Sequence, residues 1–121
     1  MLPFRMKLKM LYIMIYQLVG EIMVKHIILW KLQEEYNNIK IKEAIKNSLE
    51  GLVGKIPGLV EIKVETEGLS SSTADVMLYS VFENEQALKE YAIHPEHQFV
   101  ANTYVRPYTE SRLCLDFESA L

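Results

Sequence analysis

The 121-residue sequence contains one cysteine, Cys114. An intrachain disulfide needs a second cysteine, so none can form, and a cysteine-based zinc site is not expected either. Cys114 lies in a predicted strand, and nothing near it in the sequence favours a reactive thiol. The low cysteine content fits a reducing compartment, and we therefore expect a cytoplasmic location.

An excess of positive charge is also absent. Aspartate and glutamate number 16 against 13 lysines and arginines, and no basic run or stripe of basic and aromatic residues occurs after residue 25. Proteins that bind nucleic acid usually carry such a basic surface, so we expect no nucleic-acid partner. Half of the residues are apolar, which suffices for the core of one domain at this length.

The sequence also lacks an apolar run of the roughly 20 residues that cross a bilayer, and we expect no membrane partner. Residues 1–22, MLPFRMKLKMLYIMIYQLVGEI, imitate a signal peptide, but no small-residue cleavage site follows their apolar run. They are either an amphipathic N-terminal extension or an upstream stretch outside the native protein, which then starts at Met23; the second interpretation is favoured. The rest of the chain is acidic, with 10 positive and 15 negative residues.

The sequence does contain a clear succession of strand and helix patterns. Residues 24–31 read as a strand with apolar residues on both faces. Apolar residues then recur at helical spacing from residue 38 until a Pro-Gly pair at 57–58 ends the helix. Residues 59–66 alternate as a half-buried strand, and residues 73–82 are its expected partner in an antiparallel hairpin.

The second helix begins after Asn84, a typical N-cap, and should end or kink at His94 because Pro95 disfavours helical backbone geometry before it. A further helical piece follows, whose expected inward residues are Phe99, Val100 and Tyr104. Residues 111–117 alternate as the last strand. The order β-α-β-β-α-β predicts an α+β, ferredoxin-like protomer whose four-stranded antiparallel sheet has both helices on one face.

The other face of that sheet has no cover within the protomer. Large contiguous apolar patches are uncommon on monomers, so we expect a partner to cover it. Two copies packed sheet to sheet as an isologous dimer would do so. The fold therefore predicts a homodimer.

Four segments resemble the stress-responsive dimeric α/β-barrel (Dabb) family: MVKHIILWKL at 23–32, GKIPGLVEIKV at 54–64, YSVFENEQALKEYAIHPEHQFV at 79–100 and CLDFE at 114–118. The resemblance implies a ferredoxin-like protomer whose dimer forms an α/β barrel. It also implies a small stress-responsive protein, without an assigned reaction for most bacterial members. Residues 23–118 are accordingly predicted to be one Dabb domain.

A more distant resemblance, to the plant enzyme olivetolic acid cyclase, supplies candidate catalytic residues. In its Tyr-x-x-His-Pro-x-His motif, the tyrosine and the second histidine are associated with acid/base chemistry in polyketide ring closure. The matching residues here are Tyr91 and His97, and the histidine of the first strand matches His26. A further pocket histidine of the cyclase is replaced by Val76, which argues against the same substrate.

Each candidate also has a structural interpretation. His97 is either a general base or a histidine that bonds a backbone carbonyl and steadies the joint after Pro95. Tyr91 either polarises a substrate carbonyl or bonds one of the histidines, and His26 is more typical of a satisfied core histidine than of a ligand. His94 is expected to end the helix and donate to its last carbonyls.

The remaining candidates concern a pocket and a metal. Walls for a small apolar or aromatic ligand are expected from Trp30, Phe99 and Tyr104, although such residues also occur in plain cores. Asp116 and Glu96 would join the histidines as metal ligands, but no established ligand spacing is present, so neither a metal nor another cofactor is expected. Haem chemistry, as in distant relatives of the barrel superfamily, would need a histidine at the iron, and none is suitably placed.

Two functions remain open on this basis. The leading interpretation is a Dabb dimer that binds a small apolar or aromatic ligand. The competing one is a cyclase- or lyase-like enzyme, in which His97 removes a proton next to a carbonyl while Tyr91 and His26 stabilise the enolate oxygen.

Overall fold

The structure, a computed structural model, describes residues 22–120 together with residues 8, 10 and 11. Its elements in chain order are β1 (Ile22–Leu32), α2 (Ile39–Glu50), β2 (Leu59–Glu65), β3 (Val76–Phe82), α3 (Glu85–Ile93), α4 (Pro95–Val100) and β4 (Thr109–Ala120). The predicted extension, residues 1–22, falls almost wholly outside the described residues, so its two interpretations stay open.

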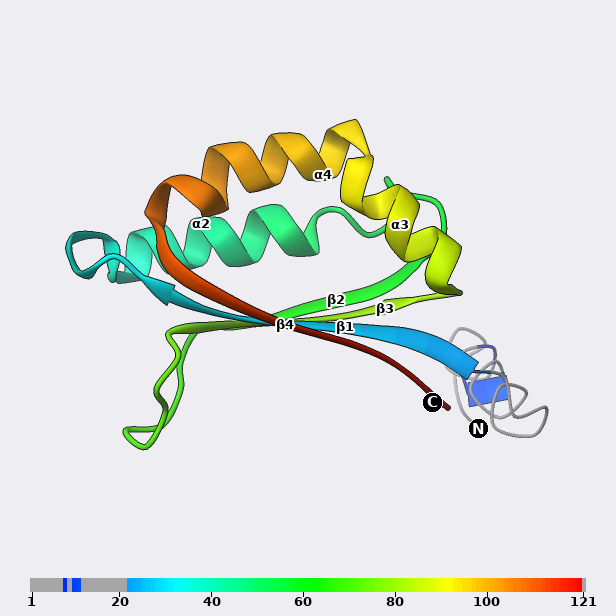
Figure 1. Cartoon of the computed structure of the whole chain (residues 1–121), viewed down its shortest axis with the longest axis horizontal. Helices are drawn as coiled ribbons and strands as arrows, with labels where there is room; N and C mark the ends of the chain where they lie inside the picture. The colour runs from blue at the N-terminus through cyan, green and yellow to red at the C-terminus, as the bar shows by residue number, and fades with distance from the viewer. Residues whose placement is uncertain (1–7, 9, 12–21, 121) are drawn as a thin grey trace.

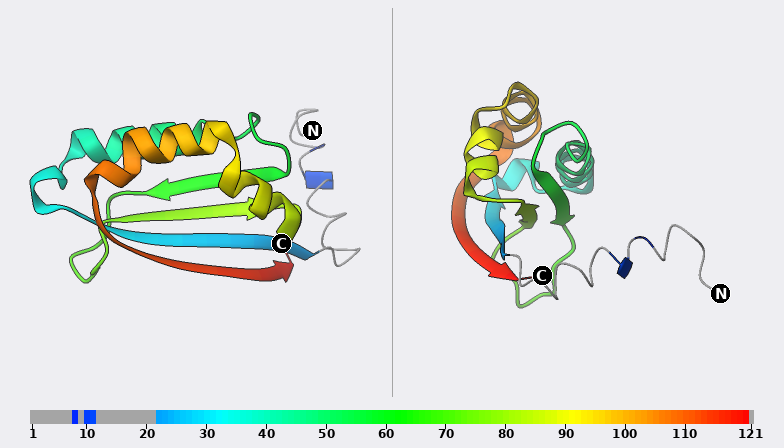
Figure 2. Two further views of the ribbon diagram at one scale, coloured as in Figure 1. Left: turned by 45° about the horizontal axis from the view of Figure 1, so that its top comes forward. Right: turned by 90° about the vertical axis from the view of Figure 1, so that its right-hand side faces the viewer.

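The strands form one antiparallel sheet in the order β2-β3-β1-β4. The helices gather on one face of the sheet (Figure 1), and β4 (red) lies at its edge beside β1 (blue) (Figure 2). The predicted ferredoxin-like α+β fold is therefore confirmed. No helix in the described part of the chain is long and apolar enough to cross a membrane.

The first helix is shorter than its apolar spacing predicts. It ends at Glu50, and turns occupy the residues up to the start of β2. The prediction that the helix continues to Pro57 is wrong because glycines interrupt it: Gly51 caps its end and Gly54 has a φ of 90°, which other residues rarely adopt. Ile56 still packs into the core, so the apolar spacing reports burial correctly although the helix has ended.

The two faces of the sheet differ in cover. The helix-covered face holds the core, which includes Ile28, Ile45, Leu78 and Phe82. The other face carries an apolar strip on β4, the strand that pairs with β1. The strip consists of Leu113, Leu115 and Phe117. All three are exposed, and Leu113 exposes 73% of its surface. An exposed apolar strip of this kind is what the predicted face-to-face dimer would bury.

The prediction that Phe99 points inward is wrong, since its side chain is 60% exposed. The buried residues of this stretch are Val100 in α4 and then Ala101 and Val105 in a π-helical turn, Ala101–Val105. Phe99 lies one residue, about 100° around the helix, from Val100. Tyr104 is partly buried and packs against the core, with the Phe99 ring edge-on at 6.3 Å between ring centroids.

Candidate functional site

The joint between α3 and α4 is built by His94 and Pro95. His94 ends α3, as predicted, and its backbone is extended, with φ −66° and ψ 134°. Its ring Nδ1 accepts a hydrogen bond from the Glu96 N–H at 3.1 Å. The His94 backbone N–H donates to the Tyr91 carbonyl at 3.1 Å, so the predicted bond to the last carbonyls of α3 is made by the backbone and not by the ring. Pro95 restarts a helix at once, so the ring caps the first turn of α4 instead.

His97 follows this joint and lies half-buried with its ring stacked on Tyr91, at 4.1 Å between centroids. Its Nδ1 lies 3.3 Å from the Ala92 carbonyl, so the tautomer with the proton on Nδ1 satisfies that oxygen and leaves Nε2 as a proton acceptor. Burial lowers the pKa of His97, as do the charges of Arg106 and His26, while the bond to Ala92 opposes the change. The ring is therefore neutral at neutral pH.

Tyr91 is 2% exposed, and its hydroxyl has no hydrogen-bond partner among the described residues. The predicted bond to His26 or His97 is not formed; the ring packs edge-on against Phe82 and His26 instead, at 4.9 and 6.3 Å between centroids. Burial raises the pKa of Tyr91, so the phenol keeps its proton. A buried hydroxyl without a partner is energetically unfavourable, and the Tyr91 hydroxyl still has a hydrogen bond to donate.

His26 is a satisfied histidine, as the structural interpretation predicted. It is buried on β1, and its Nδ1 contacts the carboxylate of Asp116, its cross-strand partner on β4. The Cys114 Sγ lies 3.6 Å from that nitrogen and 3.4 Å from the Asp116 Oδ1. Burial raises the pKa of the Cys114 thiol, and Asp116 adds to the effect, which agrees with the predicted unreactive thiol.

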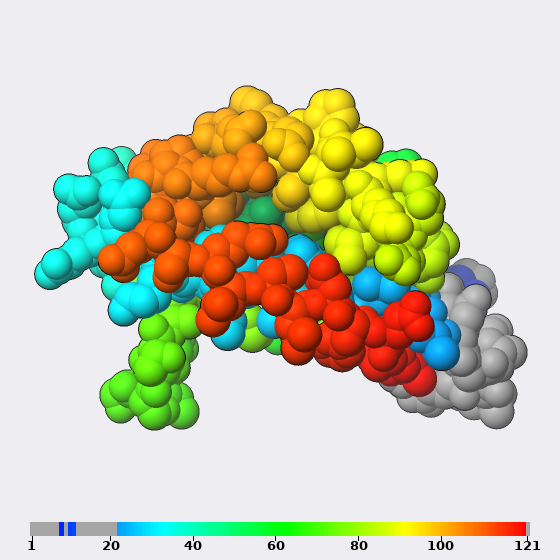
Figure 3. Space-filling view, in the orientation of Figure 1, coloured from blue at the N-terminus to red at the C-terminus, as the bar shows by residue number. Residues whose placement is uncertain are grey.

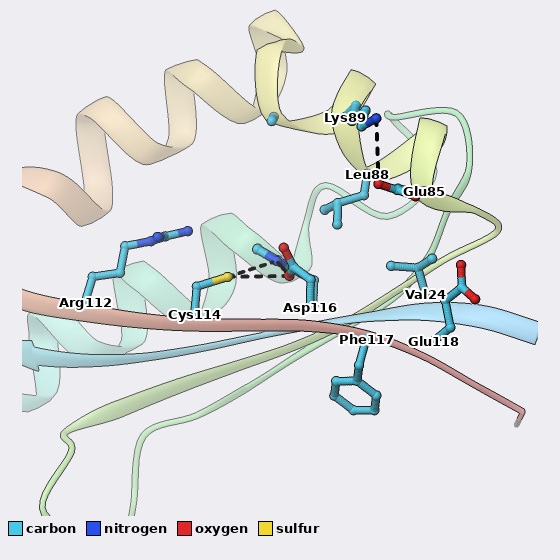
Figure 4. Close-up of a pocket in the computed structure, with 11 residues that line it drawn as sticks. Val24, Glu85, Leu88, Lys89, Arg112, Cys114, Asp116, Phe117 and Glu118 are labelled. Carbon is cyan, nitrogen blue, oxygen red and sulfur yellow. Dashed lines mark hydrogen bonds and ion pairs between the residues drawn. The ribbon is translucent and has the colours of Figure 1, made fainter.

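Two adjoining cavities open between α3, α4 and β4. Figure 3 shows this side of the molecule hollowed between the strand and the helices. The first cavity has a volume of about 620 Å³ and is lined by Cys114 and Asp116, among others. Their side chains project from β4 toward α3, whereas Phe117 projects from the opposite side of the strand (Figure 4). The second, of about 390 Å³, is lined by His26, Tyr91 and His97. The three predicted catalytic residues therefore line one cavity.

The aromatic residues predicted to form a pocket do not all reach these cavities. Trp30 lines the second cavity, together with Ile28, Leu88 and Val105. Phe99 and Tyr104 line neither of the two. Phe99 is exposed because it lies about 100° around α4 from the buried Val100, and Tyr104 packs against the core.

Sequence reasoning missed the cationic wall of the second cavity. Its charged lining residues other than histidine are Arg106 and Arg112, and no carboxylate lies within ion-pair distance of either guanidinium in the described part of the chain. Arg106 donates instead to the neutral Gln98 Oε1, at 3.2 Å. The alternation of β4 predicts that Arg112 lies on the same face of the strand as Cys114. Only the pairing of β4 with β1 places Arg112 at this cavity.

Comparisons with known proteins place the chain among a group with this fold. It matches the family model described as Stress responsive A/B Barrel Domain over residues 24–119. A dimeric protein of unknown function from Bacteroides fragilis is 35% identical, with a TM-score of 0.67 over 79% of this chain and 95% of that one. A dimeric ferredoxin-like protein from Thermobifida fusca is 22% identical, with a TM-score of 0.70 over 83% and 92%. No curated protein sequence matches the chain.

A hydroxynitrile lyase from Passiflora edulis is also similar, at 17% identity and a TM-score of 0.68 over 79% of this chain and 92% of that one. At identities below 25%, the lyase and the Thermobifida protein show the fold alone. The predicted likeness to olivetolic acid cyclase is not confirmed by these comparisons. The stress response, the cytoplasmic location and the roles of the site residues stay predictions.

Proposed function

The chain belongs to the stress responsive A/B barrel domain family, and on that premise we propose that it acts as a homodimer that binds a small organic compound in the cavity beside His97. The walls favour a mainly apolar or aromatic body, because Ile28, Trp30 and Leu88 line the cavity. The guanidiniums of Arg106 and Arg112 have no carboxylate partner among the described residues, and they favour an oxygen with partial or full negative charge, such as that of a carbonyl or a carboxylate.

The buried Tyr91 hydroxyl carries the proposal of a ligand site. A hydroxyl enclosed without a partner costs about 1–3 kcal/mol relative to a paired one. A ligand carbonyl at the inner end of the cavity would accept its hydrogen bond and remove that cost. The apolar strip Leu113, Leu115 and Phe117 supports the dimer, as does the dimeric state of the 35% identical Bacteroides protein.

A second candidate function, lyase- or cyclase-like catalysis, is favoured by the pairing of a neutral histidine with a protonated phenol. His97 Nε2 would take the proton from a carbon next to the substrate carbonyl; the electron pair of that C–H bond would form the C=C bond of an enolate, and the π pair of the carbonyl would move onto its oxygen. Tyr91 would donate a hydrogen bond to the resulting enolate oxygen. His97 would then return the proton to carbon or to a leaving group. The Passiflora lyase shows only that a protein of this fold can be a lyase.

Binding and catalysis are tested separately. Ligand-observed NMR measures the binding of aromatic and aliphatic β-keto acids. The affinity should weaken about tenfold in Tyr91→Phe, since this variant removes only the hydrogen bond. Tyr104→Phe is the matched control, because Tyr104 lies outside both cavities. Equal binding by both variants would contradict the assigned site.

Catalysis is measured as deuterium exchange at the carbon next to the carbonyl of the same compounds. His97→Gln should lower the exchange rate by a factor of about 10²–10⁴, the usual contribution of a general base. Binding should be retained in that variant. If His97→Gln exchanges at the rate of the native chain, the catalytic candidate is wrong and the binding function stands alone.

A further inference from the structure

Beside the His97 cavity, three different metal-ligating side chains converge from two strands. We propose that His26, Cys114 and Asp116 form a binding site for a zinc-like divalent cation. Their ligand atoms all lie within 4.8 Å of one another. This inference goes beyond the proposed function and does not depend on it.

Two of the three spacings between the ligand atoms fit tetrahedral zinc. With Zn–S near 2.3 Å and Zn–N or Zn–O near 2.0–2.1 Å, a sulfur and a nitrogen or oxygen ligand stand roughly 3.5 Å apart in a tetrahedron. The Cys114 Sγ lies 3.6 Å from the His26 Nδ1 and 3.4 Å from the Asp116 Oδ1. Only the His26–Asp116 contact must open to admit the ion, which a rotation of the partly exposed Asp116 side chain provides.

The sheet holds the three residues in this arrangement. Cys114 and Asp116 stand two residues apart on β4 and therefore share a face, and the ladder pairs Asp116 directly with His26. Ligands fixed on paired strands need little rearrangement on binding. His26 is buried, whereas Cys114 and Asp116 line the open cavity of about 620 Å³ through which an ion can enter (Figure 4).

The set of ligand atoms selects the kind of ion. Imidazole nitrogen and thiolate sulfur suit zinc, whereas magnesium and calcium prefer oxygen alone. On binding, the Cys114 thiol releases its proton to solvent and its sulfur forms the bond to the ion, while His26 binds through an unprotonated Nδ1. Thiolate and carboxylate together then balance the two positive charges. Three protein ligands leave a fourth position open toward the cavity, as in catalytic rather than structural zinc sites.

Sequence reasoning excluded a cysteine-based zinc site because it considered only sites built from several cysteines. A mixed ligand set assembled across two strands has no established spacing along the sequence. The alternation of "CLD" at 114–116 is visible in the sequence, but its proximity to His26 follows only from the pairing of the first and last strands.

The test uses Co²⁺ as a spectroscopic probe and Zn²⁺ as its competitor, on the full chain freed of metal and of any purification tag. We expect one Co²⁺ per chain, with a near-ultraviolet thiolate-to-cobalt charge-transfer band and the visible bands of a four-coordinate ion. Zn²⁺ should displace it. Cys114→Ser should abolish the charge-transfer band and weaken Zn²⁺ binding at least about tenfold, and Asp116→Asn should weaken it similarly.

Glu118→Gln is the matched control, since Glu118 lines the same cavity on the same strand but is not one of the three ligands. It should leave the band and the affinity unchanged. Two results would overturn the site: no saturable Co²⁺ or Zn²⁺ binding in the native chain, or equal binding by the native, Cys114→Ser and Asp116→Asn proteins, which would mean an adventitious ion only. Circular dichroism checks that each variant is folded.

Discussion

The two halves of the helix-covered side of the sheet are completed in different ways. Where α2 meets β2, the Glu50 carboxylate accepts from the Val64 N–H at 2.9 Å and from the Lys46 ammonium at 2.8 Å, and Lys46 also donates to the Val64 carbonyl. Where α3 and α4 face β4, two cavities stay open, and the Tyr91 hydroxyl has no hydrogen-bond partner in the part of the chain that the structure describes. In the first half the Glu50 and Lys46 side chains satisfy each other and the backbone, whereas the second half leaves the buried Tyr91 hydroxyl unsatisfied among the described residues.

The largest expected effect lies in the closed half. Ile45→Ala removes a side chain with no exposed surface, and we expect it to lower the free energy of unfolding by about 2–5 kcal/mol. Ligand affinity of the folded fraction should not change, because Ile45 lines neither of the two cavities. Urea unfolding and a binding titration measure the two quantities. A variant that keeps full stability would show that this half is not closely packed.

A smaller loss is expected from Glu50→Gln, which weakens two hydrogen bonds of a charged carboxylate. Desolvation alone would raise the pKa of Glu50, but the bonds from Lys46 and Val64 outweigh it and lower the pKa. The free energy of unfolding should fall by about 1–3 kcal/mol. Glu65→Gln is the matched control: its contact with Lys63 is exposed, so its loss should cost at most about 1 kcal/mol. Equal losses would remove the distinction.

In the open half, Tyr91→Phe should act in the opposite direction. It removes a buried hydroxyl without a partner, so the free energy of unfolding should rise by about 1 kcal/mol while ligand binding weakens. Thermal unfolding compared with binding in the same variant measures both. A loss of stability on this substitution would mean that the hydroxyl has a partner in the folded chain.

The smallest expected effect is a pH dependence. The pKa of His97 is lowered in the folded chain, so below about pH 6.5 the unfolded chain binds a proton that the folded chain resists. The neutral His97 ring therefore makes its full contribution to the free energy of unfolding above about pH 6.5. That contribution is lost as the pH falls from there through the lower pKa that His97 has in the folded chain. His97→Gln should flatten the change in unfolding free energy as the pH falls below about 6.5. An unchanged profile would show that another group titrates there.

The strands and helices could be predicted from the sequence better than the contacts within the candidate site. The alternation in residues 59–66 and the Asn84 N-cap correspond to β2 and α3 as observed, because both signals are local. The contacts of His26 with Cys114 and Asp116 depend on the pairing of strands about 90 residues apart, which no local pattern reports. Phe99 was misplaced for a third reason: it and Val100 are adjacent in α4, about 100° apart around the helix, and Val100 is the one that points into the core.

The most direct test of the central claim is a pair of crystal structures, without ligand and with an aromatic β-keto acid. We predict a ligand oxygen within about 2.5–3.0 Å of the Tyr91 hydroxyl, with the ligand body against Trp30 and its acidic group near Arg112. A cavity filled by the protein's own side chains, with the Tyr91 hydroxyl bonded within the protein and the ligand absent or bound elsewhere, would contradict it. In that case the His94–His97 segment is a helix joint and no more.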